Sequence, residues 1–279
     1  MARDPWVIEY EANEHLFLSP GLKDKQMSRS NPTEGSKNPS TRWFEWAGGS
    51  DGGFIRWYNK DTEQQQKVDG PFTFLLLDEL ATIKGWHEPS ESGIFANEVR
   101  DTRQDVFVVR SFKGGELASG IYAQIRDRII ALGGHYSASL YLAYKEGEEL
   151  RIGNLQLKGA ASGAWMEFKK ECGTVKDANG KSVRAYFVDA VTITGYEQAK
   201  KGGTVYRIPK FALKKVGEDT NRQAVALDAE LQAYLAEYLK RPKAEVAKPA
   251  EDAAPAADAP PTTGKPGDRF GDFEDDIPF

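Results

Sequence analysis

The densest mixture of aromatic and basic side chains in the chain lies between Arg42 and Tyr58. Aromatic rings can stack on nucleic-acid bases and arginine can contact phosphates, so this mixture suits the binding of a single strand. Stacking contributes about 1–3 kcal/mol per base. The candidate residues for such contacts are Arg42, Phe44, Trp46, Phe54, Arg56, Trp57 and Tyr58. For each ring the alternative is a place in the hydrophobic core, where aromatic residues are also common.

These candidates are predicted to lie on two strands around a glycine-rich turn at residues 48–53. Successive side chains of a strand point to opposite faces. The alternation gives the first strand one face with Arg42, Phe44 and Trp46, opposite Trp43 and Glu45. It gives the second strand one face with Phe54, Arg56 and Tyr58, opposite Ile55 and Trp57. One face of each strand therefore combines aromatic rings with arginine.

A second basic group lies on either side of Asn179 and Gly180, a pair that strongly favours a hairpin turn. Strands are predicted on both sides of this turn, at residues 165–170 and 183–194. The residues that could contact a nucleic acid here are Lys169, Lys170, Arg184 and Tyr186. The alternative for this group is a solvated loop.

The end of the chain, residues 271–279, joins a run of carboxylates to an apolar terminus. Its side chains are Asp272, Phe273, Glu274, Asp275, Asp276, Ile277, Pro278 and Phe279. Such a peptide cannot bury enough apolar surface to fold alone, but it can offer an aromatic ring to a pocket and carboxylates to a basic rim. A solvating acidic tail is the alternative, and it leaves the Ile-Pro-Phe ending unexplained.

This ending resembles the C-terminal tip of bacterial single-stranded DNA-binding proteins, which is an acidic run followed by Ile-Pro-Phe. The resemblance implies an oligonucleotide-binding (OB) β-barrel that covers single-stranded DNA. It also implies that residues 272–279 dock on replication and repair proteins, such as exonuclease, helicase, primase or polymerase factors. In that family the acids meet a basic rim, and the positions matching Ile277 and Phe279 enter an apolar pocket. The bacterial domain is much shorter than the body of this chain, so its tetrameric assembly is not carried over.

Residues 77–100, which begin Leu-Asp-Glu-Leu-Ala-Thr-Ile-Lys-Gly-Trp, resemble bacteriophage-encoded single-stranded DNA-binding proteins. This second resemblance implies a phage origin and a place in the host bacterial cytoplasm. A cytoplasmic location also agrees with a single cysteine, Cys172, and with an N-terminus that lacks the apolar segment of a signal peptide. No apolar run approaches the roughly 20 residues that span a bilayer, so no membrane contact is expected.

The net charge of −5 is unevenly distributed along the chain. Residues 242–279 hold four of the 37 basic residues and nine of the 42 acidic ones, which leaves 33 of each before residue 242. The body is therefore neutral, and the acidity of the whole chain does not exclude a nucleic-acid partner.

The fold class expected is mainly β, an elaborated OB-fold barrel with one or two flanking helices and a disordered acidic C-terminal tail. Further strands are predicted at residues 72–77, 105–112, 136–144 and 150–158, and a last edge strand at 206–209. Helices are predicted at 119–133, where a helix could plug one end of the barrel, and at 227–239. The domains expected are a binding domain at 1–241, an Ala/Pro-rich linker at 242–270 and the tip at 271–279.

No catalytic constellation is recognisable in the sequence. There is no phosphate-binding glycine loop and no nucleophile motif, and Cys172, His15, His87 and His135 lack zinc-site spacing. We therefore expect no catalytic residue, metal or cofactor. Two alternatives stay open: an adaptor that mimics the tip without binding DNA, and an enzyme that anneals or cleaves single-stranded DNA.

Overall fold

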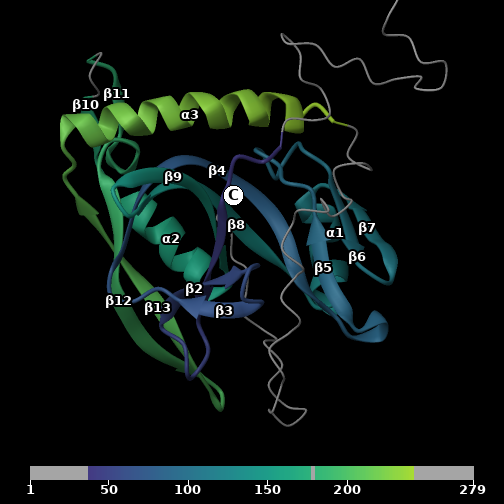
Figure 1. Ribbon diagram of the computed structural model, residues 1–279. Helices are drawn as coiled ribbons and strands as arrows, with labels where there is room; N and C mark the ends of the chain where they lie inside the picture. Colours follow the sequence, from purple (N-terminus) through teal and green to yellow (C-terminus); the bar gives the residue numbers. More distant parts are fainter. Residues whose placement is uncertain (1–36, 177–179, 242–279) are drawn as a thin grey trace, which may run out of the picture. The chain divides into compact units, whose positions relative to one another are not determined.

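The computed structural model describes residues 37–176 and 180–241. Within these residues the protein is mainly β, as predicted, with a sheet of 11 strands, a separate two-stranded hairpin and three α-helices rather than one or two (Figure 1). The linker, the tip and the residues before Lys37 lie outside the described residues.

The first seven strands are β1 (Arg42–Ala47), β2 (Phe54–Asn59), β3 (Gln64–Lys67), β4 (Phe72–His87), β5 (Ser92–Ala96), β6 (Phe107–Ser111) and β7 (Gly115–Gly120). The remaining strands are β8 (Gly134–Glu146), β9 (Glu149–Lys158), β10 (Thr174–Lys176), β11 (Ser182–Arg184), β12 (Ala190–Lys201) and β13 (Thr204–Lys214). The helices are α1 (Tyr122–Ala131), α2 (Ala160–Glu171) and α3 (Glu218–Tyr238), with short 3₁₀ turns η1 (Glu88–Ser90) and η2 (Ala185–Phe187).

The sheet divides at β4. Its strand order is β3-β2-β1-β9-β8-β4, and β8 pairs along most of one edge of β4. The other edge of β4 pairs with β12 at its beginning and with β5 at its end. The sheet therefore continues in two branches, β12-β13 and β5-β6-β7. All neighbours are antiparallel except β1 and β9, which run parallel.

The two faces of the sheet bury different apolar sets, as the alternation in β8 predicts. Ala138, Leu140 and Leu142 face an inner core that also includes residues of α1 and α2. Tyr141 and Ala143 point to the opposite, outer face, where part of the sheet is covered by α3. The predicted C-terminal helix thus packs on its own sheet, and its buried side chains include Leu231, Tyr234 and Leu235.

The segment predicted as a strand at 165–170 is instead the second half of α2. Ala161, Trp165 and Phe168 follow the three-to-four-residue spacing of a helix and face the inner core together. Phe168 and Trp165 pack on Phe211 of β13, so tertiary burial selects the helix. The strands on either side of residues 177–181 do pair antiparallel, but they are the short β10 and β11 rather than the predicted strands at 165–170 and 183–194.

The turn between β1 and β2 contacts β13. The backbone N–H of Arg207 donates to the carbonyl oxygen of Gly48 at 2.8 Å, and the indole Nε1 of Trp46 donates to the carbonyl oxygen of Arg207 at 2.8 Å. The Arg207 guanidinium also reaches the carbonyl oxygen of Gly52. These bonds connect the β1 side of the sheet to the β12-β13 branch, so the sheet curves around the inner core and α2 (Figure 1).

Candidate nucleic-acid interface

Two of the predicted stacking residues lie in the hydrophobic core. Phe44 is 2% exposed and packs on Phe72 and Tyr144, and Trp46 is 6% exposed. Their shared face was predicted correctly, but it is the face that turns toward the inner core. Neither ring is therefore accessible to a base in this conformation.

Arg42 and Trp57 lie on the same inner side and engage each other. The Arg42 guanidinium lies 4.0 Å from the centre of the Trp57 ring and also contacts Glu146. Trp57 is half-buried against the core. Both groups already have partners, so a nucleic acid would have to compete for them.

Phe54, Arg56 and Tyr58, which were predicted to share a face of the second strand, do lie on the outer face. Register opposes Arg56 to Glu45, with which it forms an ion pair, and Phe54 to Ala47. Phe54, Arg56 and Tyr58 are all half-buried and opposite in direction to Ile55, which is core. On β1, the outer face carries Trp43 and Glu45. The sequence-based prediction had instead selected the opposite face, with Arg42, Phe44 and Trp46.

Trp43 is the aromatic residue that sequence reasoning missed. It is half-buried, stands opposite Asn154 of β9, and has the ammonium of Lys60 5.9 Å from its ring centre. At the other end of the β1-β2 pair, where Phe54 stands opposite Ala47, the ammonium of Lys67 lies 4.6 Å from the Phe54 ring centre. Rings and cations therefore alternate across β1, β2 and β3 on the outer face.

The second predicted basic group gathers at the end of α2 but is partly occupied. The ammonium of Lys169 pairs with Glu79 at 2.7 Å, and Arg184 donates to the carbonyl oxygen of Cys172 at 3.3 Å. Tyr186 is half-buried beside Trp165, and Lys170 is exposed. Only the side chain of Lys170 is both exposed and without a partner among the described residues, so this group offers little to a phosphate.

The middle of the outer face is a hydrogen-bonded polar network on β8 and β9. Asn154 donates to the hydroxyl of Ser139 at 2.8 Å, and Gln156 donates to Ser139 at 3.1 Å and to the Asn154 carbonyl at 2.7 Å. Ser139 and Asn154 are buried, while Gln156 is half-buried. Ser139 and Asn154 bond within the network and are closed to a ligand, so Gln156 is the member of these three that a sugar or base edge could reach. The alternation of serines in β8 was the sequence signal for this polar face.

Glu98 reaches this network from the segment after β5. Its carboxylate accepts hydrogen bonds from the hydroxyls of Ser139 and Tyr141, the latter at 2.6 Å. The pKa of Glu98 is raised, because burial disfavours the charged carboxylate. The two hydrogen bonds and the charge of Lys84 offset only part of this rise. Such pKa shifts occur in structural networks as well as at functional sites.

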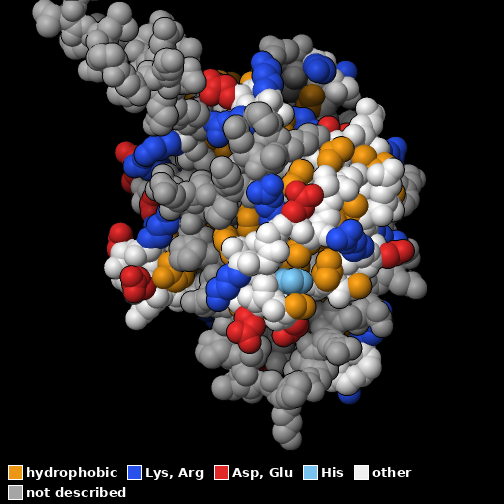
Figure 2. Space-filling view, turned by 90° about the vertical axis from the view of Figure 1, so that its right-hand side faces the viewer, with side chains coloured by type: hydrophobic (Ala, Val, Ile, Leu, Met, Phe, Trp, Pro, Cys, Tyr) orange, Lys and Arg blue, Asp and Glu red, His pale blue; other side chains and the backbone are white. Residues whose placement is uncertain are grey.

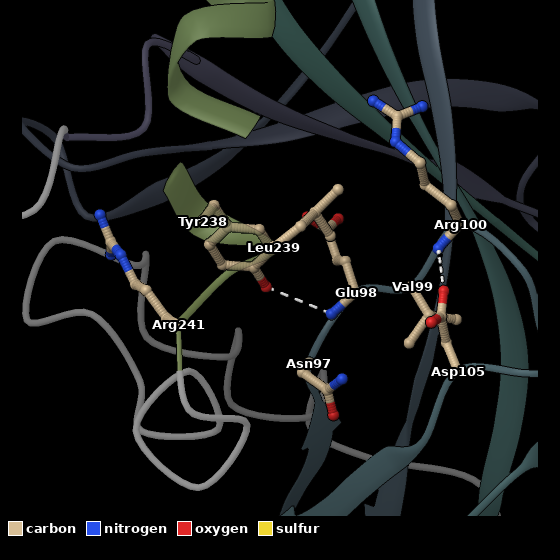
Figure 3. A pocket seen from close by; sticks show the side chains of 8 residues that line it. All are labelled: Asn97, Glu98, Val99, Arg100, Asp105, Tyr238, Leu239 and Arg241. Atoms are coloured by element: carbon tan, nitrogen blue, oxygen red, sulfur yellow. Dashed lines mark hydrogen bonds between the residues drawn. The ribbon is translucent and has the colours of Figure 1, made fainter. Parts of the chain in front are cut away.

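Glu98 also lines a pocket of about 260 Å³ between the end of α3 and residues 97–105 (Figure 3). The Tyr238 hydroxyl points toward the backbone N–H of Glu98 and accepts its hydrogen bond at 3.2 Å. Arg100 forms a paired contact with Asp78 at 3.0 and 2.6 Å. The pocket therefore joins α3 to the polar network.

Replacement of Glu98 by glutamine is expected to change the pH dependence of stability. Because the folded-state pKa is raised, wild-type stability falls as pH rises from the usual glutamate pKa, about 4.3, through the raised value. The glutamine of E98Q does not titrate. The unfolding free energy of E98Q should therefore rise relative to that of wild type as the pH rises across that window. Urea titrations at several pH values measure it.

The matched control is Glu148→Gln, since the Glu148 side chain is 95% exposed and its substitution also removes one negative charge. A stability difference for E98Q that stayed constant from acid to neutral pH would contradict the burial of a titrating carboxylate at this position.

Comparisons with known proteins give no further identification. No protein-family model matches the chain, and neither the curated proteins nor the solved structures include a significant match. In the part of the chain that the structure describes, no three His, Cys, Asp or Glu side chains are grouped to hold a metal ion. Among the same residues, none of the helices has the length and apolar character to cross a membrane.

Proposed function

We propose that this protein binds single-stranded DNA without strong sequence preference, along the outer face of β3, β2, β1 and β9. The observation that carries the proposal is the juxtaposition on this face of three half-buried rings, Trp43, Phe54 and Tyr58, with the half-buried Gln156 of β9 and the exposed Lys60 and Lys67. Stacking on rings accommodates any base, whereas a polar surface can contact sugars and phosphates.

Exposed lysines around the face support the proposal. Lys60 and Lys67 border the rings, Lys158 ends β9, and Lys84 of β4 stands beside the network. Acids lie among these lysines as well: Glu45, which pairs with Arg56, Glu98 of the network, and the exposed Asp61, Glu63 and Asp69. The support is therefore local, from Lys60 beside Trp43 and Lys67 beside Phe54, where a phosphate next to a stacked base could be contacted.

We further propose that the core of the fold is an OB barrel. The OB fold is a five-stranded, partly open Greek-key barrel that binds oligonucleotides on its second and third strands. The chain order β4, β8, β9, α2, β12, β13 fits it, with α2 rather than α1 as the helix that fills the barrel. The pairings of β4 with β8 and β12, of β8 with β9, and of β12 with β13 are all antiparallel, so β9 and β13 run in the same direction.

Under this assignment β8 and β9 are the second and third strands, and the proposed binding face includes the outer side of β9 at Gln156, whereas that of β8 is buried. The parallel strand β1 and its turn bridge the opening between β9 and β13. The β5-β6-β7 branch with α1 is then an insertion between the first two strands of the barrel.

Titration with oligo-dT tests the binding activity. We expect quenching of tryptophan fluorescence and an affinity that falls steeply with salt concentration. Lys67→Glu should weaken binding several-fold and reduce the salt slope by about 1, because it removes a phosphate contact. Arg222→Glu makes the same charge change on α3, where the side chain is 78% exposed, and should have little effect.

The other outcomes of this titration identify the alternatives. Absence of binding by the full chain would refute the proposal and favour an adaptor that only recruits partners. Metal-dependent loss of the oligonucleotide would instead indicate a nuclease.

We propose that the tip, residues 271–279, recruits replication or repair proteins, on the strength of its acidic Ile-Pro-Phe ending. Its deletion should abolish capture of such partners from a bacterial extract while the affinity for oligo-dT stays unchanged or rises. A scrambled tip of the same composition is the control, since it keeps the charge and loses the order. Loss of DNA binding on deletion would show that the tip is part of the DNA site.

A further inference from the structure

The outer face continues across β4 onto β5 and β6, beyond the strands discussed above. Register places Trp86 of β4 opposite Gly93 of β5, and the N–H of Phe112, directly after β6, donates to the Gly93 carbonyl oxygen at 3.2 Å. Ile94 and Val109 are core residues, so the residues next to them in the strands, Phe95 among them, point to the outer side. Phe95 therefore shares that side with the rings of Trp86 and Phe112. Gly93 has no side chain, and it lies between Trp86 and Phe112.

These three rings form an accessible aromatic group. Phe112 is 42% exposed, whereas Trp86 and Phe95 are half-buried. The rings of Phe95 and Phe112 are 4.6 Å apart between centres and tilted by 38°. The side of the molecule that carries β5, β6 and β7 shows hydrophobic side chains interspersed with lysine and arginine (Figure 2).

Two cations lie on the same side as the rings. Lys84 comes two residues before Trp86, and Arg110 comes two residues before Phe112. Because side chains two apart in a strand share a face, each cation lies on the same side as its ring. Lys84 is exposed. The Nε atom of Arg110 is buried and has no hydrogen-bond partner among the described residues, and the Nη2 atom lies 3.7 Å from a carboxylate oxygen of Glu116. That distance is at the outer limit of an ion pair, so the guanidinium retains donors for another anion.

We propose that Lys84, Trp86, Phe95, Arg110 and Phe112 form a second stacking platform that extends the single-stranded DNA site across β4. This inference rests on the proposed function and adds a binding surface to it. Neighbouring strands are about 4.8 Å apart, so the platform adds roughly 10 Å to the face, enough for a few more nucleotides. The combination of rings with two cations favours DNA over a second copy of the chain, since lysine is depleted at the centre of protein–protein interfaces and a phosphate backbone attracts both cations.

The platform is tested with Phe112→Ala and with labelled oligo-dT of about 15 nucleotides, within the range that one OB domain covers. We expect the affinity to fall by about 5-fold or more, as for loss of one stacked base. Phe112→Tyr keeps the ring and should restore binding. Phe187→Ala removes an equally accessible ring, 47% exposed, from η2 and should leave the affinity unchanged.

A second measurement locates the DNA directly. Photocrosslinking of iododeoxyuridine-containing oligomers to the wild-type chain should give adducts in the peptides that carry Trp86 and Phe112. Wild-type affinity in Phe112→Ala together with no adducts in these peptides would overturn the platform and leave the proposed function standing. Absence of any oligonucleotide binding by wild type would overturn both. A change in sedimentation mass without a change in affinity would show a contact between copies instead.

Discussion

Replacement of Trp165 by alanine is expected to lower the free energy of unfolding by about 3–5 kcal/mol. Trp165 is fully buried on α2, and its ring lies 5.3 Å from Phe211 of β13 and 5.5 Å from Phe168 between ring centres. Alanine would leave a cavity at the point where the helix meets the β12-β13 branch. The loss is large because rigid neighbours on the sheet cannot collapse into the space.

Trp165→Phe separates packing from the polar cost of the indole. The Nε1 atom of Trp165 is buried without a hydrogen-bond partner among the described residues, so phenylalanine removes an unsatisfied donor while keeping an aromatic ring. The decrease in unfolding free energy should therefore be clearly smaller for Trp165→Phe than for Trp165→Ala. Urea unfolding followed by circular dichroism gives both values. Equal losses for the two variants would mean that the site does not depend on ring packing.

The sheet was largely predictable from the sequence because alternation is a local property. Residues 136–144 alternate polar and apolar side chains, and β8 follows that pattern with its apolar set in the core. By contrast, residues 160–171 contain apolar positions compatible with either a helix or a strand. Packing of Trp165 on β13, a strand more than thirty residues later in the chain, decides in favour of the helix.

Helix boundaries were less predictable than helix existence. The first helix was predicted to begin at residue 119, where serine is a favourable capping residue, but Ser119 lies in β7 and pairs with Val108. The helix starts three residues later, after Ile121, with no side-chain cap. Pairing with β6 satisfies the backbone of Ser119, so the sheet overrides a favourable capping residue.

The binding face illustrates a different limit. Alternation divided β1 correctly into two sets, but it could not tell which set faces the core. That choice depends on β9, which pairs with β1 in parallel from more than a hundred residues away. Leu155 is opposite Phe44 and is fully buried, so the set that contains Phe44 is internal and Trp43 is external. Long-range parallel pairing leaves no local pattern in the sequence.

Trp43→Ala is therefore expected to weaken binding of single-stranded DNA by about 5- to 150-fold, the equivalent of 1–3 kcal/mol for a stacked base. The ring lies beside the polar network of β9, with Lys60 near its face, so a base stacked on it would bring its phosphate close to a cation. Fluorescence anisotropy with labelled oligo-dT measures the loss, and urea unfolding checks that the variant stays folded.

Trp43→Phe provides the matched control, because it retains a flat ring at the same position and should recover most of the affinity. A general loss of affinity from destabilisation would affect both variants in proportion to their stability, whereas loss of stacking would affect only alanine. If Trp43→Ala bound DNA as tightly as wild type while Phe112→Ala did not, the single-stranded DNA would follow the β4-β5-β6 side alone. The outer side of β1 would then serve only to complete the sheet, and the rings of β2 would have to be explained as packing.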